Sequence, residues 1–209
     1  MKLDRETLLS ALQNVAAYIT KKGGNVTVIA IGGAINTIYL RSRQTTHDVD
    51  FFNNYLTADD FKHLIQGARE AAKRNPELEE SWFNNRTILF IPKDQRQTLT
   101  DQAFAQREVI FRQGGLTVLA APWQYAFCCK LDRLAGSGLH GARSYDLDDA
   151  VQYLRRYLVK AGQTQVSYTT VREWFTQYLL RWTSANDEVV TKVNTTYRAA
   201  FRVQYNVIA

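Results

Sequence analysis

Two aspartates separated by one residue, Asp48 and Asp50, are the residues of this 209-residue chain best suited to chemistry. In the segment from His47 to Phe52, polar and apolar side chains alternate between Asp48 and Phe51, which is typical of a β-strand. Both carboxylates then point to one face of the strand, roughly 7 Å apart. Such a pair is costly unless a cation lies between its members. A divalent metal, Mg²⁺ or Mn²⁺, provides that charge, so Asp48 and Asp50 are candidate metal ligands.

A pair of glycines, Gly32 and Gly33, lies upstream, directly after the apolar run Val26–Ile31. The run predicts a strand buried on both faces, and Ala34–Arg41 has the spacing of a short helix. Glycines in such a turn have no Cβ, which lets backbone N–H groups approach a phosphate. Either motif alone favours an ordinary turn or a charged edge strand. Their combination in this order predicts a site for a nucleoside triphosphate and a divalent metal.

The glycine pair, the short helix and the segment Thr46–Asp50 together resemble the signature of the DNA polymerase β type nucleotidyltransferase superfamily. More narrowly, they are similar to its minimal AbiEii/MenT-like branch. The resemblance covers residues 26–52 and 116–158. It implies a nucleotidyltransferase fold in which Gly32, Gly33 and Thr46 contribute to nucleotide binding.

The later part of the chain also matches this family. Its pattern of a helical Lys, then an Arg, then Asp-x-x-Asp is present as Lys130, Arg143, Asp146 and Asp149. The resemblance implies that Lys130 and Asp146 act with the two metal ligands in catalysis. It also implies that Lys130 and Arg143 bind the nucleotide.

Two positions depart from the family pattern. The family places an arginine two residues before the threonine, whereas here Gln44 has that spacing and Arg43 is one residue away. The next expected strand, Trp82–Ile91, contains no carboxylate, although polymerase-like members place a third metal ligand there.

The environment of Lys130 has two interpretations. Pro122 is suited to the start of a helix, and on that helix Lys130 falls in the middle of the apolar face formed by Trp123, Phe127 and Leu134. A lysine there either extends its stem out to solvent or meets an anion. Beside a triphosphate pocket, and at the family's lysine position, the second interpretation is favoured.

The two acidic residues of the next helix are also open to two interpretations. Asp146 and Asp149 share one side of that helix, whereas Asp148 lies on the solvent side. They can form a helix cap favoured by the helix dipole. By family position, Asp146 also faces the active site and orients Lys130 or Arg143.

The fold expected from these patterns is α/β (α+β), with a small mixed sheet flanked by helices. Residues 1–121 form the nucleotidyltransferase core, and residues 122–209 form a C-terminal helical region that completes the active site. Residues 107–111 and 116–120 predict two further strands. Polar residues 92–101 predict a mobile loop, and the glycine-rich residues 136–141 predict a flexible one.

The net charge of +6 is concentrated near the C-terminus, where residues 151–209 carry 8 Lys and Arg against 3 Asp and Glu. Arginines alternate there with aromatic residues, which suits phosphate contact and base stacking, so tRNA is a possible acceptor. The same residues admit a structural interpretation. Val171, Trp174, Phe175, Tyr178 and Trp182 form one helical stripe, as core-facing residues do.

Composition excludes several classes of protein. A hydrophobic content of 45% is ample for a core, and the two adjacent cysteines, Cys128 and Cys129, argue against a disulfide framework or a four-ligand zinc site. No apolar run approaches the ~20 residues of a membrane helix, and no signal pattern opens the chain. We therefore expect a cytoplasmic protein that does not bind a membrane.

These patterns predict a Mg²⁺-dependent nucleotidyltransferase. It would transfer a nucleoside monophosphate from a nucleoside triphosphate to a hydroxyl of tRNA, of a protein or of a small molecule, and release pyrophosphate. Two alternatives belong to other classes: a non-catalytic nucleotide-binding module, and an RNA-binding or toxin-type interaction protein that acts through its basic C-terminal helices.

Overall fold

A computed structural model describes residues 2–136 and 141–209, and the chain divides into two compact units, residues 1–122 and 123–209. The loop expected at residues 136–141 therefore lies largely outside the described residues. The elements of the first unit are β1 (Leu3–Asp4), α1 (Arg5–Lys21), β2 (Val26–Ile31), α2 (Gly33–Ile35), η1 (Asn36–Leu40), β3 (Thr45–Thr46), β4 (Val49–Phe52), α3 (Ala58–Arg74), β5 (Phe83–Asn84), η2 (Arg86–Phe90), α4 (Gln95–Gln106), β6 (Val109–Gln113) and β7 (Leu116–Ala120). Those of the second are α5 (Trp123–Leu134), α6 (Asp146–Ala161), α7 (Tyr168–Gln177) and α8 (Ser184–Phe201).

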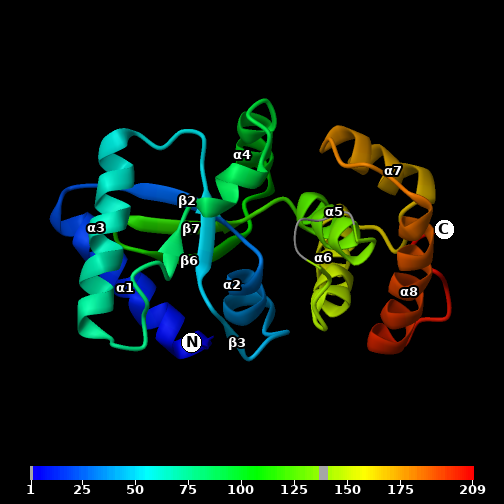
Figure 1. Ribbon diagram of the computed structural model, residues 1–209, viewed down its shortest axis with the longest axis horizontal. Helices are drawn as coiled ribbons and strands as arrows, with labels where there is room; N and C mark the ends of the chain where they lie inside the picture. The colour runs from blue at the N-terminus through cyan, green and yellow to red at the C-terminus, as the bar shows by residue number, and fades with distance from the viewer. Residues whose placement is uncertain (1, 137–140) are drawn as a thin grey trace. The chain divides into compact units, whose positions relative to one another are not determined.

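A mixed five-stranded sheet organises the first unit, with the strand order β5-β4-β2-β7-β6. Figure 1 labels β2, β7 and β6 of this sheet. The central strand β2 pairs antiparallel with β4 and parallel with β7. Its apolar and β-branched side chains suit a strand that is buried on both faces, and Val28, Ile29 and Ala30 are fully buried. The α/β (α+β) class and the small mixed sheet expected from the sequence are confirmed.

Two helices of the first unit, α1 and α3, begin at residues whose side chains cap them. Asp4 accepts a hydrogen bond from the Thr7 amide at 2.8 Å before α1, and Thr57 and Asp60 form a reciprocal capping box before α3. The two helices pack side by side, and α1 also packs against β6 and β7 (Figure 1). This packing buries the apolar stripe of α1, as its helical spacing predicts.

The prediction of a strand at Trp82–Ile91 is wrong. β5 has only two residues and is followed by the 3-10 helix η2. The chain turns because the Asn84 side-chain oxygen accepts a hydrogen bond from the Arg86 amide at 2.9 Å. Asparagine side chains favour such turns over extended strands.

The prediction of a mobile loop at residues 92–101 is also wrong, because most of this segment belongs to helix α4. Leu99 and Ala103 are buried on this helix, while most of its other side chains are polar. Arg96 fixes the start of the helix by donating hydrogen bonds to the carbonyls of Ile88 and Ile91 at 2.9 and 3.2 Å. These contacts are not visible in the local sequence pattern.

Helices form the second unit, as expected for the C-terminal region. α5 and α6 pack against each other, and Trp123 stacks on Tyr153 at 5.9 Å between ring centroids. Val171, Trp174, Phe175 and Tyr178 are buried, which confirms the structural interpretation of that stripe, whereas Trp182 is only half-buried. The rings of Trp174, Phe175 and Tyr178 are therefore core side chains.

The two cysteines are free thiols, as expected. Burial raises the pKa of Cys128 well above its usual range and that of Cys129 to about 11, so neither is a thiolate at neutral pH. Within the described part of the chain, no helix is both long and apolar enough to cross a membrane.

Candidate metal and nucleotide site

The register between β2 and β4 brings the two sequence motifs together. Ile31, the last residue before the glycine turn, pairs with Asp50 in the antiparallel ladder. Asp48 precedes β4, so continuing the same register carries it past the end of β2 to the level of the glycine turn. Both aspartates are half-buried. Gly32, Gly33, Asp48 and Asp50 therefore gather at one end of β2, as the sequence predicts.

The two glycines are required for different reasons. Gly32 has φ 79°, a conformation that favours glycine, and a Cβ added to it would meet nothing within 4 Å. At Gly33 a Cβ would overlap Thr46 Oγ1 and lie 3.0 Å from Thr46 Cβ. Gly32 thus leaves open space beside its backbone, whereas Gly33 allows Thr46 to pack directly on the turn.

Thr46 and Arg43 complete this end of the sheet. Thr46 is buried, and its hydroxyl donates to the Asp48 carbonyl at 3.5 Å, near the limit for a hydrogen bond. Arg43 Nη1 lies 3.3 Å from the position of a Gly33 Cβ. The guanidinium therefore reaches the turn although its spacing from Thr46 departs from the family pattern.

Replacing Gly33 by alanine is expected to displace Thr46 and the Asp48 segment and to cost about 1–3 kcal/mol of unfolding free energy, because the new Cβ overlaps the threonine. Gly32→Ala is the matched control, since it strains the backbone without a clash. Urea unfolding of both variants with and without Thr46→Ala measures the coupling. Thr46→Ala should offset part of the cost of Gly33→Ala and none of the cost of Gly32→Ala. Equal coupling in both cases would contradict this account of the turn.

The residue beside Asp50 on the outer strand is an amide. β4 and β5 run parallel, and Asp50 pairs with Asn84, whose side-chain nitrogen donates to the Ser81 carbonyl at 3.2 Å. Among the described residues, no group of three or more His, Cys, Asp or Glu side chains is arranged to hold a metal. Asp48 and Asp50 are therefore not part of such a larger group.

The short helix after the glycines is mainly a π-helix, η1. The apolar spacing of Ala34–Arg41 predicts the helix but not its wider turn. Asn36 and Thr37 are fully buried there, although the sequence patterns do not single them out. Isolated π-helical turns occur frequently at functional sites.

In the second unit, Lys130 forms a buried ionic cluster. Its Nζ lies 2.6 Å from Asp146 Oδ1 and 2.7 Å from Asp149 Oδ2, and the lysine is 6% exposed. Asp146 and Asp149 are 0% and 1% exposed. The lysine therefore does not extend to solvent, and the anions that it meets are protein carboxylates.

Two arginines surround this cluster. Arg133 lies 3.6 Å from Asp146 Oδ1, and the Arg143 amide donates to Asp146 Oδ2 at 2.9 Å. The Arg143 side chain is exposed and donates to the Tyr145 hydroxyl at 2.8 Å. The sequence patterns do not single out Arg133, although its i+3 spacing from Lys130 places it on the same side of α5. Asp146 is thus a shared acceptor that joins α5 to the start of α6.

The pKa of Asp146 lies below its usual value. Burial acts to raise it, but hydrogen bonds from Lys130 and from the Arg143 amide, with the charges of Lys130 and Arg133, outweigh burial. A carboxyl group with a lowered pKa stabilises the fold above its unfolded pKa, about 3.9, and loses this effect as the pH falls through its folded pKa.

We expect acid to destabilise the wild type more steeply than Asp146→Asn. The variant should be less stable at pH 7, because an amide cannot replace the charge beside Lys130, but its stability should fall less between about pH 4 and pH 2. Urea unfolding at a series of pH values measures both slopes. Parallel slopes would contradict the lowered pKa.

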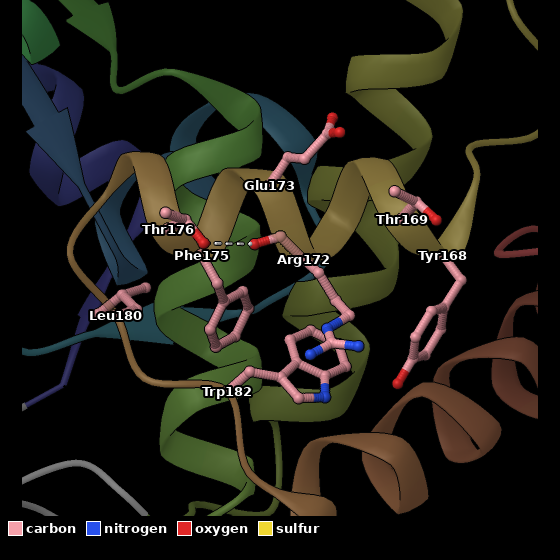
Figure 2. A pocket seen from close by; sticks show the side chains of 8 residues that line it. All are labelled: Tyr168, Thr169, Arg172, Glu173, Phe175, Thr176, Leu180 and Trp182. Atoms are coloured by element: carbon pink, nitrogen blue, oxygen red, sulfur yellow. Dashed lines mark hydrogen bonds between the residues drawn. The ribbon is translucent and has the colours of Figure 1, made fainter.

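A cavity of about 260 Å³ lies on the surface of the second unit, along α7 (Figure 2). Its walls include Phe175, Leu180 and Trp182, with the Arg172 guanidinium 5.9 Å from the Trp182 ring. The Trp182 indole N–H donates to Asp187 at 3.0 Å, so its polar edge is already satisfied. None of the residues predicted for the reaction lines this cavity.

The fold and the two residue clusters define a mixed α/β protein with a helical C-terminal unit. The chain belongs to the family described as a domain of unknown function (DUF7582), which matches residues 1–204. No curated protein and no solved structure matches the chain.

Proposed function

We propose that the chain is a metal-dependent nucleotidyltransferase whose nucleotide site is built on the glycine turn and the Asp48–Asp50 segment. The observation that carries the proposal is the pairing of Ile31 with Asp50, which puts the carboxylates beside the turn. A second contact supports it, since Thr46 packs on Gly33 and links the two motifs directly.

The donor set fits a hard divalent cation. Mg²⁺ and Mn²⁺ prefer oxygen ligands, and Mg²⁺ is commonly bound by one or two carboxylates together with substrate phosphates. Asp48 and Asp50 would hold the ion, and the triphosphate would provide further oxygens. The bound ion supplies positive charge that offsets the charge of the phosphates.

The protein groups near the aspartates have separate roles in this proposal. The open space beside the Gly32 backbone admits a phosphate to the turn, and the Arg43 guanidinium adds positive charge next to Gly33. Thr46 fixes the distance between the turn and the aspartates. The site therefore combines fixed positive charge with a pair of metal ligands.

The roles of Lys130, Asp146 and Arg143 in the reaction rest on the resemblance to the family. Lys130 is already balanced by two carboxylates, so Asp146 acts first to hold and orient the lysine. For Lys130 and Arg143, the proposal keeps the nucleotide-binding role that the resemblance implies.

The reaction would join an acceptor hydroxyl oxygen to the α-phosphorus and break the bond from the α-phosphorus to the bridging oxygen of pyrophosphate. The hydroxyl proton is released in the same reaction. tRNA, a protein hydroxyl and a small molecule are the acceptor classes.

A second candidate function is a nucleotide-binding module without catalysis. It is favoured by Asn84, which stands next to Asp50 where a further carboxylate would strengthen metal binding. Both functions predict binding of a nucleoside triphosphate, and they differ in turnover.

Pyrophosphate release distinguishes the two. The wild type would be incubated with each nucleoside triphosphate, Mg²⁺ and a mixture of total tRNA and cell protein, and pyrophosphate would be measured against an Asp50→Asn control. Release that requires Asp50 supports the transferase. Binding without release supports the module.

A further inference from the structure

The N-terminal residues form a small sheet with the segment that leads to the aspartates. β1 and β3 pair antiparallel, with Leu3 opposite Thr46 and Asp4 opposite Thr45. This pair is separate from the five-stranded sheet, and within the described residues β1 is the only strand that pairs with β3. Leu3 is 1% exposed, so its burial anchors β1.

The next residue, Arg5, holds a second point of the same segment. It is the first residue of α1, and its Nε donates to the Ile38 carbonyl in η1 at 3.0 Å. Carbonyls in the last turn of a helix lack partners within the helix, so a side-chain donor at this end fixes it. Three consecutive residues thus contact the chain on both sides of the stretch from Arg41 to Gln44.

That stretch has no regular structure of its own. Arg41 has φ 54°, and residues 41–44 are exposed or half-buried outside any helix or strand. The position of Thr46, and with it that of Asp48, therefore depends on what holds the two ends. The backbone of Thr46 pairs with β1, and its side chain packs against Gly33, where there is no Cβ.

We propose that Leu3 and Arg5 are positioning residues for the Asp48–Asp50 site. They act through Thr46 and Ile38 and do not touch the ligand. Leu3 sets the position of β3 and thereby the approach of Asp48 to the glycine turn, while Arg5 sets the end of η1. That these residues position a metal and nucleotide site rests on the proposed function. The contacts of Leu3 and Arg5 that hold residues 45–50 in place, which we call the brace, do not depend on it.

The test variants are Arg5→Met, which keeps the length of the side chain and removes its donors, and Leu3→Ala, which removes buried contacts. Arg5→Lys restores one donor and tests rescue. Thr57→Ala is a matched control, because it removes the cap of α3 and lowers stability away from β1. Glu6→Gln, an exposed neighbour on α1, is a second control.

The first readout is amide hydrogen exchange without any ligand. We expect exchange at residues 45–50 to become about 3- to 10-fold faster in Arg5→Met, as loss of one hydrogen bond implies, and faster still in Leu3→Ala, which loses buried contacts. Exchange in β7 should stay unchanged. Arg5→Lys should return exchange towards the wild-type rate, and the two controls should leave it as it is.

The second readout is the dissociation constant of a Mg²⁺–nucleoside triphosphate complex, which should rise about 3- to 10-fold in Arg5→Met and recover in Arg5→Lys. Unchanged exchange in both variants would overturn the brace. Faster exchange with unaltered nucleotide affinity would overturn the positioning role. A wild type that binds no triphosphate would instead refute the proposed function, and the exchange rates would still decide whether the brace exists.

Discussion

Lys130→Met is expected to cost about 3–5 kcal/mol of unfolding free energy at pH 7. The lysine ammonium lies 2.6 Å from Asp146 and 2.7 Å from Asp149, and both carboxylates are buried. Methionine matches the length of the side chain but takes this cation away from two buried negative charges, and Arg133 lies farther off, 3.6 Å from Asp146. Breaking a buried ion pair from one side is much more costly than removing the whole pair.

The variant should also respond to pH in the opposite direction from the wild type. Burial is the largest influence that raises the pKa of the Asp146 carboxyl, and without Lys130 less opposes it, so stability should rise as the pH falls from neutral towards 4. The wild type should show no such gain, because its Asp146 pKa is lowered. Urea unfolding at pH 7, 5.5 and 4.5 measures this difference.

Two further variants test the explanation. Lys130→Met combined with Asp146→Asn and Asp149→Asn should recover much of the lost stability, since no buried charge remains. Asp148→Asn, on the exposed side of the same turn, should change stability by less than about 0.5 kcal/mol. A loss below about 1 kcal/mol in Lys130→Met would contradict a buried cluster.

The double variant Asp48→Asn/Asp50→Asn is expected to lose metal-dependent nucleotide binding and to lower turnover by about 10²–10³-fold or more. Amides keep the shape of the side chains but remove the negative charges that Mg²⁺ requires. Both aspartates are half-buried, so the fold should remain intact. Pyrophosphate release and circular dichroism measure the two effects separately.

Asp59→Asn is the matched control for this variant, because Asp59 is an exposed carboxylate in the first turn of α3. It should leave turnover unchanged. Full turnover in the double variant would exclude the proposed metal ligands, even if the protein proved to be a nucleotidyltransferase.

The sheet could be predicted because its strands have strong local signals. β2 and β7 are short apolar runs bounded by glycines or by a proline, and β4 alternates with period two. Such runs are stabilised as strands by their burial in the sheet, so the structure that the local pattern predicts is the one that forms. β5 and α4 could not be predicted, because a hydrogen bond from the Arg86 amide and two from Arg96 decide their conformation.

The candidate site could be predicted only in part for a similar reason. Gly32, Gly33, Asp48 and Asp50 are close in sequence and joined by one short connection, so a strand pairing suffices to bring them together. The contact between Thr46 and Gly33 depends on side-chain packing. The brace at Leu3 and Arg5 joins residues more than thirty positions apart. Neither feature has a periodic signal in the sequence.

The residues of the Lys130 cluster could be predicted from the sequence, but the anions that the lysine contacts could not. Helical spacing places Lys130 on an apolar face and puts Asp146 and Asp149 on one side of their helix. Spacing alone does not decide whether the lysine meets a phosphate or a carboxylate. The packing of α5 against α6 supplies the two carboxylates.

The most direct test of the central claim is a calorimetric titration of the wild type with each nucleoside triphosphate, with Mg²⁺ and with EDTA, repeated on Asp48→Asn/Asp50→Asn. We expect at least one triphosphate to bind in Mg²⁺, EDTA to abolish this binding, and the double variant to show none. Absence of binding for every triphosphate, or equal binding in the double variant, would contradict a nucleotide site at Asp48 and Asp50.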